Sequence, residues 1–295
     1  MTIPSAPTGA DKPKLYLEQS WWAMSGLGTG EREWTLEEKF AKIAEAGYDG
    51  ICGFIPGETD TRAWRRLLDE YRLGFSGLAF PSSVMDLKRT MAEAKRFGNV
   101  NYLNAQVMDA FVAGDDAVRL LRELLDTAEE AGIALRIETH RGTVTQDLLR
   151  TVSYVEAIPA LPLTIDLSHY VVAGEMNGTG EAAEACFDRL LAHTAGIHAR
   201  VSDGEKVQVD IGSDGAHPML PHFRRWWGKG MREWRRRAAP GAVLPFVTEL
   251  GPPGYYAITR RLPDGSDAEI SNRWEQALLF KRIAERLWAE IDAEG

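Results

Sequence analysis

Cysteine is scarce in this sequence, with only Cys52 and Cys186, and neither belongs to a C-x-x-C motif. A disulfide framework is therefore not expected, and a reducing compartment such as the cytoplasm is favoured. Long apolar runs are also missing, because no stretch approaches the roughly 20 apolar residues that a membrane helix needs. Residues 1–14 lack the apolar segment of a signal peptide. These absences predict a cytoplasmic protein without a membrane partner.

Positive charge is outnumbered, since 34 Lys and Arg residues face 43 Asp and Glu residues and the formal net charge is -9. A broad acidic surface disfavours binding to a nucleic-acid backbone. The tract from Arg224 to Arg237 is locally basic, but tryptophans and apolar residues interrupt it at helical spacing. We therefore expect a packed helix with a solvated basic face, and no nucleic-acid partner.

Several catalytic and nucleotide-binding motifs are absent as well. The run Gly26-x-Gly28-x-Gly30 lacks the spacing of a G-x-G-x-x-G fingerprint, and no G-x-x-x-x-G-K-[ST] loop is present. No Ser-His-Asp or Cys-His arrangement has a supporting context. The phosphate site common in barrel enzymes is not recognisable either, which favours a free or glycosidic sugar over a sugar phosphate.

The sequence does contain a regular alternation of short β-like runs with longer helical ones. Strands alternating with helices predict a parallel sheet, and eight such units in one chain match an α/β fold with a single (β/α)8 TIM barrel. An open doubly wound sheet is the alternative. We assign residues 1–13 to a flexible N-terminal tail and residues 14–295 to the barrel domain. The expected strands are 15–21, 48–55, 73–80, 102–107, 133–138, 161–166, 197–201 and 243–248, and the expected helices are 35–47, 61–71, 83–97, 115–131, 146–157, 181–194, 217–237 and 272–291.

Polar residues stand at the carboxyl ends of four successive predicted strands. Because strand residues alternate between the barrel interior and the helix layer, these residues share the inward parity and the end where barrel active sites lie. Arg136 would also face inward, lower in the barrel, and no carboxylate partner for it is evident from the sequence. The four strand-end residues are Glu138, Asp166, His198 and Glu249.

These four side chains predict a site for one divalent metal ion. Carboxylates favour hard ions and an imidazole admits transition metals, so Mn²⁺ is the first expectation, with Mg²⁺, Co²⁺ or Zn²⁺ as alternatives. Three buried carboxylates without a cation would repel one another. For any single residue, a salt-bridged carboxylate at a strand end is an equally ordinary explanation, and the argument for a metal depends on all four together.

Several stretches resemble the xylose isomerase-like TIM-barrel family of sugar isomerases and epimerases, also described as AP endonuclease family 2 barrels. They are QSWWAMSG, EEKFAKIAEAGYDGI, IETHRGTVTQDLLRTV, LTIDLSHYVV, IHARV and VTELGPPGYY. The resemblance implies that the four strand-end residues are the metal ligands. It also implies that His169 and Arg200 bind substrate. The sequence departs from xylose isomerases in lacking the D-x-D element that helps to hold a second metal.

The ligand set suggests a sugar isomerase or epimerase. A metal that polarises a carbonyl acidifies the neighbouring C–H bond and stabilises an enediolate, and Glu138 and Glu249 could remove and return the proton. A leaving group beside the same carbanion would make the enzyme a lyase or hydratase acting on a 3-keto-glycoside. A non-catalytic, sugar-binding barrel subunit is a further alternative. A DNA-nicking hydrolase is disfavoured by the negative net charge of the chain.

Further residues could contact the substrate, a small sugar or keto-glycoside. His140 shares the inward parity of Glu138, and Gln106 and Asn104 end the fourth strand, where polar filling of the barrel is the competing explanation. Trp21 or Trp22 could form an apolar wall against a sugar ring, although core packing suits at least one of them. We list His140, Gln106 and Trp21 as candidate substrate-binding residues.

The sequence leaves the oligomeric state undecided, and a homo-oligomer is possible. The family that the sequence resembles often forms dimers or tetramers. Three tryptophans of the basic helix, Trp226, Trp227 and Trp234, are expected to be exposed and could serve such a contact.

Overall fold

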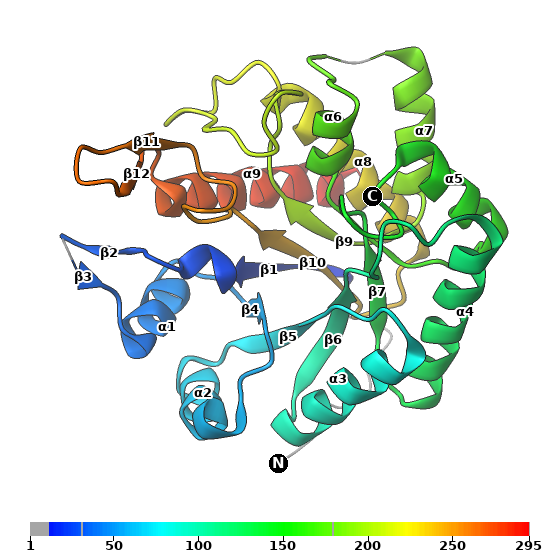
Figure 1. Ribbon diagram of the computed structural model, residues 1–295, viewed down its shortest axis with the longest axis horizontal. Coiled ribbons are helices and arrows are strands. Elements are labelled where there is room, and N and C mark those ends of the chain that lie inside the picture. The colour runs from blue at the N-terminus through cyan, green and yellow to red at the C-terminus, as the bar shows by residue number, and fades with distance from the viewer. Residues whose placement is uncertain (1–11, 31, 179, 295) are drawn as a thin grey trace.

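The computed structural model describes residues 12–30, 32–178 and 180–294. In this part of the chain, eight parallel strands close into a barrel that helices surround (Figure 1), in the order β1-β10-β9-β8-β7-β6-β5-β4. The predicted (β/α)8 barrel is therefore confirmed. The tail expected at residues 1–13 lies outside the described residues except for Lys12 and Pro13. The barrel strands are β1 (Lys14–Ser20), β4 (Gly50–Gly53), β5 (Gly74–Ala79), β6 (Val100–Ala105), β7 (Leu135–Glu138), β8 (Leu163–Ile165), β9 (Thr194–Ala199) and β10 (Val243–Thr248).

The helices follow the predicted alternation, and most boundaries differ by a few residues. They are α1 (Leu36–Glu45), α2 (Glu58–Tyr71), α3 (Val84–Phe97), α4 (Gly114–Glu130), α5 (Leu148–Ala157), α6 (Ser168–Ala173), α7 (Glu181–Leu191), α8 (Leu220–Arg237) and α9 (Arg273–Ala293). Four small features on the loops were not predicted. These are the 3-10 helix η1 (Trp22–Met24), the short helix α6 directly after β8, and two hairpins, β2 (Gly28–Thr29) with β3 (Arg32–Glu33) and β11 (Thr259–Arg261) with β12 (Asp267–Glu269).

The start of α1 shows how local sequence sets an element. The Thr35 side chain accepts a hydrogen bond from the Glu38 backbone, and the Glu38 side chain accepts one from the Thr35 backbone at 2.8 Å. This is the capping box that the sequence predicts, and it satisfies two backbone donors that a helix start otherwise leaves free. The helix ends at Glu45, and Gly47, directly after its C-cap Ala46, adopts a φ of 72° that favours glycine.

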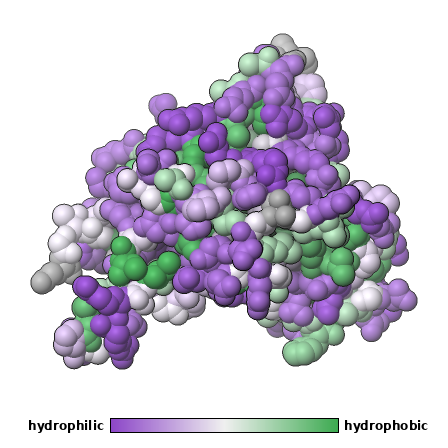
Figure 2. All heavy atoms as spheres, turned by 90° about the horizontal axis from the view of Figure 1, so that it is seen from above, coloured by the Kyte–Doolittle hydropathy of each residue, from purple (hydrophilic) through white to green (hydrophobic). Residues whose placement is uncertain are grey.

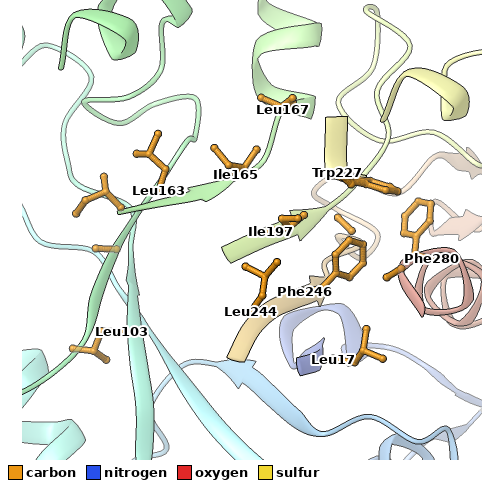
Figure 3. Close-up of a cluster of buried hydrophobic side chains, with 14 of the residues drawn as sticks. Leu17, Leu103, Leu163, Ile165, Leu167, Ile197, Trp227, Leu244, Phe246 and Phe280 are labelled. Atoms are coloured by element: carbon orange, nitrogen blue, oxygen red, sulfur yellow. The ribbon is translucent and has the colours of Figure 1, made fainter. Parts of the chain in front are cut away.

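The outward faces of the strands pack under the helices (Figure 3). Ile197 of β9 and Phe246 of β10 are paired in register and fully buried. The Phe246 ring lies 5.5 Å from the Trp227 ring of α8, which in turn lies 5.7 Å from the Phe280 ring of α9. This arrangement confirms the predicted outward parity of Phe246 and leaves the opposite side of each strand for the polar residues.

The expectation that the α8 tryptophans are exposed was wrong for two of them. Trp226 and Trp227 are each only 1% exposed, because both rings face the barrel and its neighbouring helices. Trp234 is half-buried against Trp288 of α9. An oligomer contact through Trp226 and Trp227 is therefore excluded by packing.

The basic residues of α8 occupy its outer face, as predicted. They pair with acidic side chains of the adjoining helices: Arg225 with Glu184, Lys229 with Asp188, and Arg232 with Glu294. Hydrophilic residues likewise dominate the face of the molecule in Figure 2. No helix in the described ranges has the length and apolar character to cross a membrane.

Candidate metal centre

The carboxyl ends of β7 to β10 bring the predicted strand-end residues together. Glu138 ends β7, Asp166 follows β8, His198 lies near the end of β9, and Glu249 follows β10. All four side chains are at most 4% exposed. Burial of this many polar groups requires that each finds a partner, because an unpaired buried charge is strongly destabilising.

Three of these residues converge on one point, and we call them the Glu–His–Glu cluster: Glu138, His198 and Glu249. The His198 Nδ1 atom lies 3.3 Å from Glu138 Oε1 and 3.2 Å from Glu249 Oε2. One donor atom from each residue lies within 4.8 Å of the other two. Glu138 Oε1 is buried and accepts no well-aligned hydrogen bond among the described residues, and its contact with His198 Nδ1 is a charge contact. An orphaned carboxylate oxygen beside an imidazole nitrogen and a second carboxylate suits a divalent cation.

The electrostatics of the cluster depend on His198. Burial alone would lower the pKa of His198, but the Glu249 and Glu138 carboxylates outweigh it and hold that pKa well above its ordinary value. Burial likewise opposes ionisation of Glu138, yet His198 lowers the Glu138 pKa to about 2. Without a metal ion the cluster is therefore an ion pair of an imidazolium with carboxylates. A metal would take over the charge that the imidazole proton supplies.

Amide side chains of β6 and of the residue that follows it fix the orientation of Glu138. Asn104 Nδ2 donates to Glu138 Oε2 at 2.6 Å, and Gln106 Nε2 donates to the same oxygen at 3.0 Å. With Oε2 bonded twice, Oε1 is turned toward His198. Gln106, expected to contact substrate, thus contacts Glu138 in this structure.

Arg200 occupies the gap between Glu249 and Asp166. Its Nη2 donates to Glu249 Oε2 at 2.7 Å, its Nε donates to the Glu249 carbonyl oxygen at 3.0 Å, and its Nη1 donates to Asp166 Oδ2 at 3.0 Å. The same Nη1 lies 3.2 Å from His169 Nε2. Asp166 belongs to neither of the groups of possible metal ligands found among the described residues.

Two histidines and a tyrosine cover the cluster. The His140 and His169 ring centroids are 3.9 Å apart, and both residues could join Glu138 in a second group of possible ligands. The Tyr256 hydroxyl lies 3.5 Å from His140 Nε2, and its ring lies 4.7 Å from the Arg200 guanidinium. Burial, with help from the nearby His140, lowers the pKa of His169 well below its ordinary value and keeps that ring neutral.

Tyr256 was not among the residues chosen from the sequence. Its signal was its position in the long loop after Glu249, a strand-end residue, because long loops on this rim of a barrel commonly wall the site. Trp21, by contrast, is not brought to the cluster. Its ring packs on Phe40 at 5.5 Å and on Trp64 at 4.5 Å, whereas Trp22 lies edge-on to Tyr256 at 5.4 Å.

A second buried network lies on the inner face of the barrel, where Arg136 and the carboxylate of Glu18 both contact Tyr102. Glu18 of β1 is fully buried and accepts hydrogen bonds from Ser76 Oγ at 2.5 Å and Tyr102 Oη at 2.6 Å. The Arg136 guanidinium lies 3.8 Å from the Tyr102 ring centroid. Burial raises the pKa of Glu18, and the nearby Arg136 charge partly offsets this. Glu18 is the carboxylate that sequence reasoning did not find, and its inward parity on β1 was the available signal.

The cluster is covered rather than open. A cavity of 540 Å³ lies instead at α2 and α3, where Glu58, Arg96 and Phe97 are among its lining residues. Over the cluster, the half-buried side chains of His140 and Tyr256 form the outer layer. The loop that carries Tyr256 therefore forms part of the layer between the cluster and solvent.

The barrel, with polar strand ends gathered on one rim, defines the class of protein, and comparison with known proteins defines the family. The sequence matches the model described as "Xylose isomerase-like TIM barrel" over residues 40–236. The chain therefore belongs to the xylose isomerase-like TIM-barrel family. The matched region contains Glu138, Asp166 and His198 and ends before Glu249. No curated protein matches the sequence directly.

Solved structures support the same fold. One is a xylose isomerase-like TIM barrel protein from Mycobacterium smegmatis in complex with magnesium, with TM-score 0.58, 14% identity, and coverage of 94% of this chain and 97% of the other. Another is the probable 3-DHS dehydratase AsbF from Bacillus anthracis, with TM-score 0.53, 13% identity and coverage of 81% and 94%. A third is D-allulose 3-epimerase from Methylomonas sp. in complex with D-allulose, with TM-score 0.51, 17% identity and coverage of 83% and 89%. Enzymes of different reaction classes thus share this barrel, and identities this low show the fold alone.

Proposed function

We propose that this protein is a divalent-metal-dependent sugar isomerase or epimerase that removes a proton next to a carbonyl group. The observation that carries the proposal is the Glu–His–Glu cluster, in which Glu138 Oε1 is buried without a well-aligned hydrogen bond beside His198 Nδ1. The net charge of the buried groups also supports a bound divalent ion. The three buried carboxylates and the Arg200 guanidinium leave two negative charges when His198 is neutral, and one divalent cation balances them.

Two carboxylates and an imidazole would hold the ion, and this donor set suits Mn²⁺ first, with Mg²⁺, Co²⁺ or Zn²⁺ as alternatives. A bound divalent ion supplies Lewis acidity to a carbonyl oxygen. The magnesium complex of the mycobacterial neighbour supports the choice of a divalent ion.

The protein side chains supply the proton transfer. Two amide side chains hydrogen-bond to Glu138 Oε2 and stabilise its ionised form, which favours Glu249 as the group that removes the proton. For isomerisation, Glu249 would take the proton from one carbon and return it to the neighbouring carbon. Epimerisation would need a second group, Glu138, to be protonated beforehand and to deliver its proton to the opposite face, while the proton removed stays on Glu249. Arg200 and His169 lie beside Glu249 and Asp166, where they could orient substrate oxygens.

Elimination from a 3-keto-glycoside is a second candidate for the same site. It is favoured by the His140–Tyr256 contact, because a leaving group needs a proton donor and these two polar side chains cover the cluster. Sugar isomerisation also moves a proton between two substrate oxygens, but it releases no group and needs no donor to a departing oxygen.

The test is deuterium exchange from solvent into a panel of ketoses and 3-keto-glycosides, with Mn²⁺ present and the metal content of each sample measured. We expect exchange at the carbon beside the carbonyl with wild-type protein. Glu249→Gln should lower the exchange rate by a factor of about 10³ or more, whereas Glu205→Gln, an exposed change on the loop after β9, should leave it unchanged.

Each outcome separates the candidates. Exchange with a rearranged sugar as product supports the isomerase or epimerase, and exchange with release of an aglycone supports elimination. Metal loading without exchange into any member of the panel would contradict both and favour a non-catalytic sugar-binding barrel.

A further inference from the structure

Arg200 is the most completely bonded side chain at the rim of the barrel. It is 1% exposed, and all three of its guanidinium nitrogens donate hydrogen bonds. Two of its acceptors are carboxylates on different strands, Asp166 after β8 and Glu249 after β10. The planar, always charged guanidinium therefore lies as a fixed cation between two predicted metal ligands.

Asp166 has little capacity left for a second cation. Its Oδ1 accepts from Ser168 Oγ at 2.6 Å and from the Ser168 backbone nitrogen at 2.9 Å, which uses both lone pairs. Its Oδ2 accepts from Arg200 Nη1 at 3.0 Å and lies 3.5 Å from His169 Nε2. A metal ion bound to Oδ2 would stand directly against the Arg200 charge, and repulsion between two buried cations is strong. Glu249 differs from Asp166, because Arg200 bonds only Oε2 of its carboxylate and no described residue donates a hydrogen bond to its Oε1.

We propose that Asp166 is a positioning residue for Arg200 and not a metal ligand, so that three side chains of this chain hold the ion instead of four. The metal site is then the Glu–His–Glu cluster alone, with Arg200 as a permanent positive charge beside it. Three protein ligands leave more coordination positions open than four do. Arg200 is placed to contact an anionic oxygen of the substrate next to those positions.

This inference rests on the metal-binding part of the proposed function and is independent of the reaction catalysed. The key variant is the double substitution Asp166→Asn with Arg200→Met, which removes one negative and one positive charge together. Replacing both members of a buried ion pair is tolerated far better than replacing one. The controls are His198→Ala, which removes a ligand, and Asp166→Asn alone, which leaves the Arg200 charge uncompensated.

Mn²⁺ affinity is measured on metal-stripped, full-length proteins from the electron paramagnetic resonance signal of free Mn²⁺, and circular dichroism checks that each variant is folded. We expect the double variant to bind Mn²⁺ within about threefold of wild type, because no ligand is lost. His198→Ala should weaken binding by a factor of about 100 or more, and Asp166→Asn alone by about 10, through the unpaired charge.

A loss of tenfold or more in the folded double variant overturns the inference and makes Asp166 a ligand. Wild-type protein that binds no Mn²⁺ overturns the inference together with the metal-dependent function. Should the double variant not fold, line broadening by ¹⁷O-water on wild-type protein with Mn²⁺ decides instead. In a site of about six ligands, roughly three bound water oxygens support three protein ligands, and roughly two overturn the inference.

Discussion

Asn104 donates a hydrogen bond to Glu138 at 2.6 Å, and this contact joins a strand with no predicted ligand to the metal centre. Groups that orient a metal ligand commonly contribute 10- to 100-fold to metal affinity or activity. We therefore expect Asn104→Ala to weaken Mn²⁺ binding by about that factor, measured by titration calorimetry. Asn101→Ala, an exposed change on the same strand, is the matched control, and an equal loss in both variants would contradict the assignment.

Tyr256 is expected to act as the movable cover of the site. Its ring lies over Arg200 at 4.7 Å and over Arg141 at 4.9 Å, so its removal exposes the rim of the cluster. Tyr256→Ala should lower kcat/KM by a factor of about 10 or more, with Mn²⁺ affinity unchanged. Tyr255→Ala, at a neighbouring side chain that is 72% exposed, should have little effect on kcat/KM. A change in metal affinity for Tyr256→Ala would instead place Tyr256 in the support of the metal centre.

The buried carboxyl group of Glu18 should make stability depend on pH. Burial raises its pKa above the ordinary value of 4.5, so the folded state holds the proton more tightly than the unfolded state does. The free energy of unfolding therefore falls as pH rises above the unfolded pKa. Urea unfolding between pH 4 and 8 should show Glu18→Gln gaining stability relative to wild type as pH rises. A constant difference across this range would contradict a raised pKa.

The cap of α1 gives a test of local stability that is remote from the metal centre. Thr35→Ala removes the acceptor for the Glu38 backbone and should lower the free energy of unfolding by about 1 kcal/mol. Thr35→Ser keeps a hydroxyl group and should cost much less. Both free energies of unfolding are measured by urea denaturation. Equal destabilisation of the two variants would contradict a capping role for the Thr35 hydroxyl group.

Much of the fold could be predicted from the sequence, because each strand and each long helix carries its own periodic pattern. The capping box of α1 and the outward parity of Phe246 were both readable from local residues. Helix α6 and the two hairpins were not, because elements this short contain too few residues for a period to show.

The candidate site was predicted only in part, because the sequence indicates which residues stand at strand ends but not which side chains they contact. Polar residues at strand ends stand out in a sequence, so Glu138, His198 and Glu249 could be brought together by topology alone. Which partner each side chain takes depends on three-dimensional contacts. Glu18 and Tyr102, which share a hydrogen bond, are 84 residues apart, and nothing local to either one indicates the other. The Arg200 contacts to Asp166 and Glu249 could not be predicted from the sequence for the same reason.

Closure of the barrel between β1 and β10 has a consequence for how the protein is made. Glu249 follows β10, which pairs along its length with β1 at the start of the described chain. Strand β10 also pairs with β9, and the Glu249 backbone nitrogen donates to Ala199 of β9, so the last barrel strand must be added before the third side chain of the cluster is in place. A partly synthesised chain would carry Glu138 and His198 without Glu249, so a metal ion held by all three side chains would be bound only after translation has passed β10.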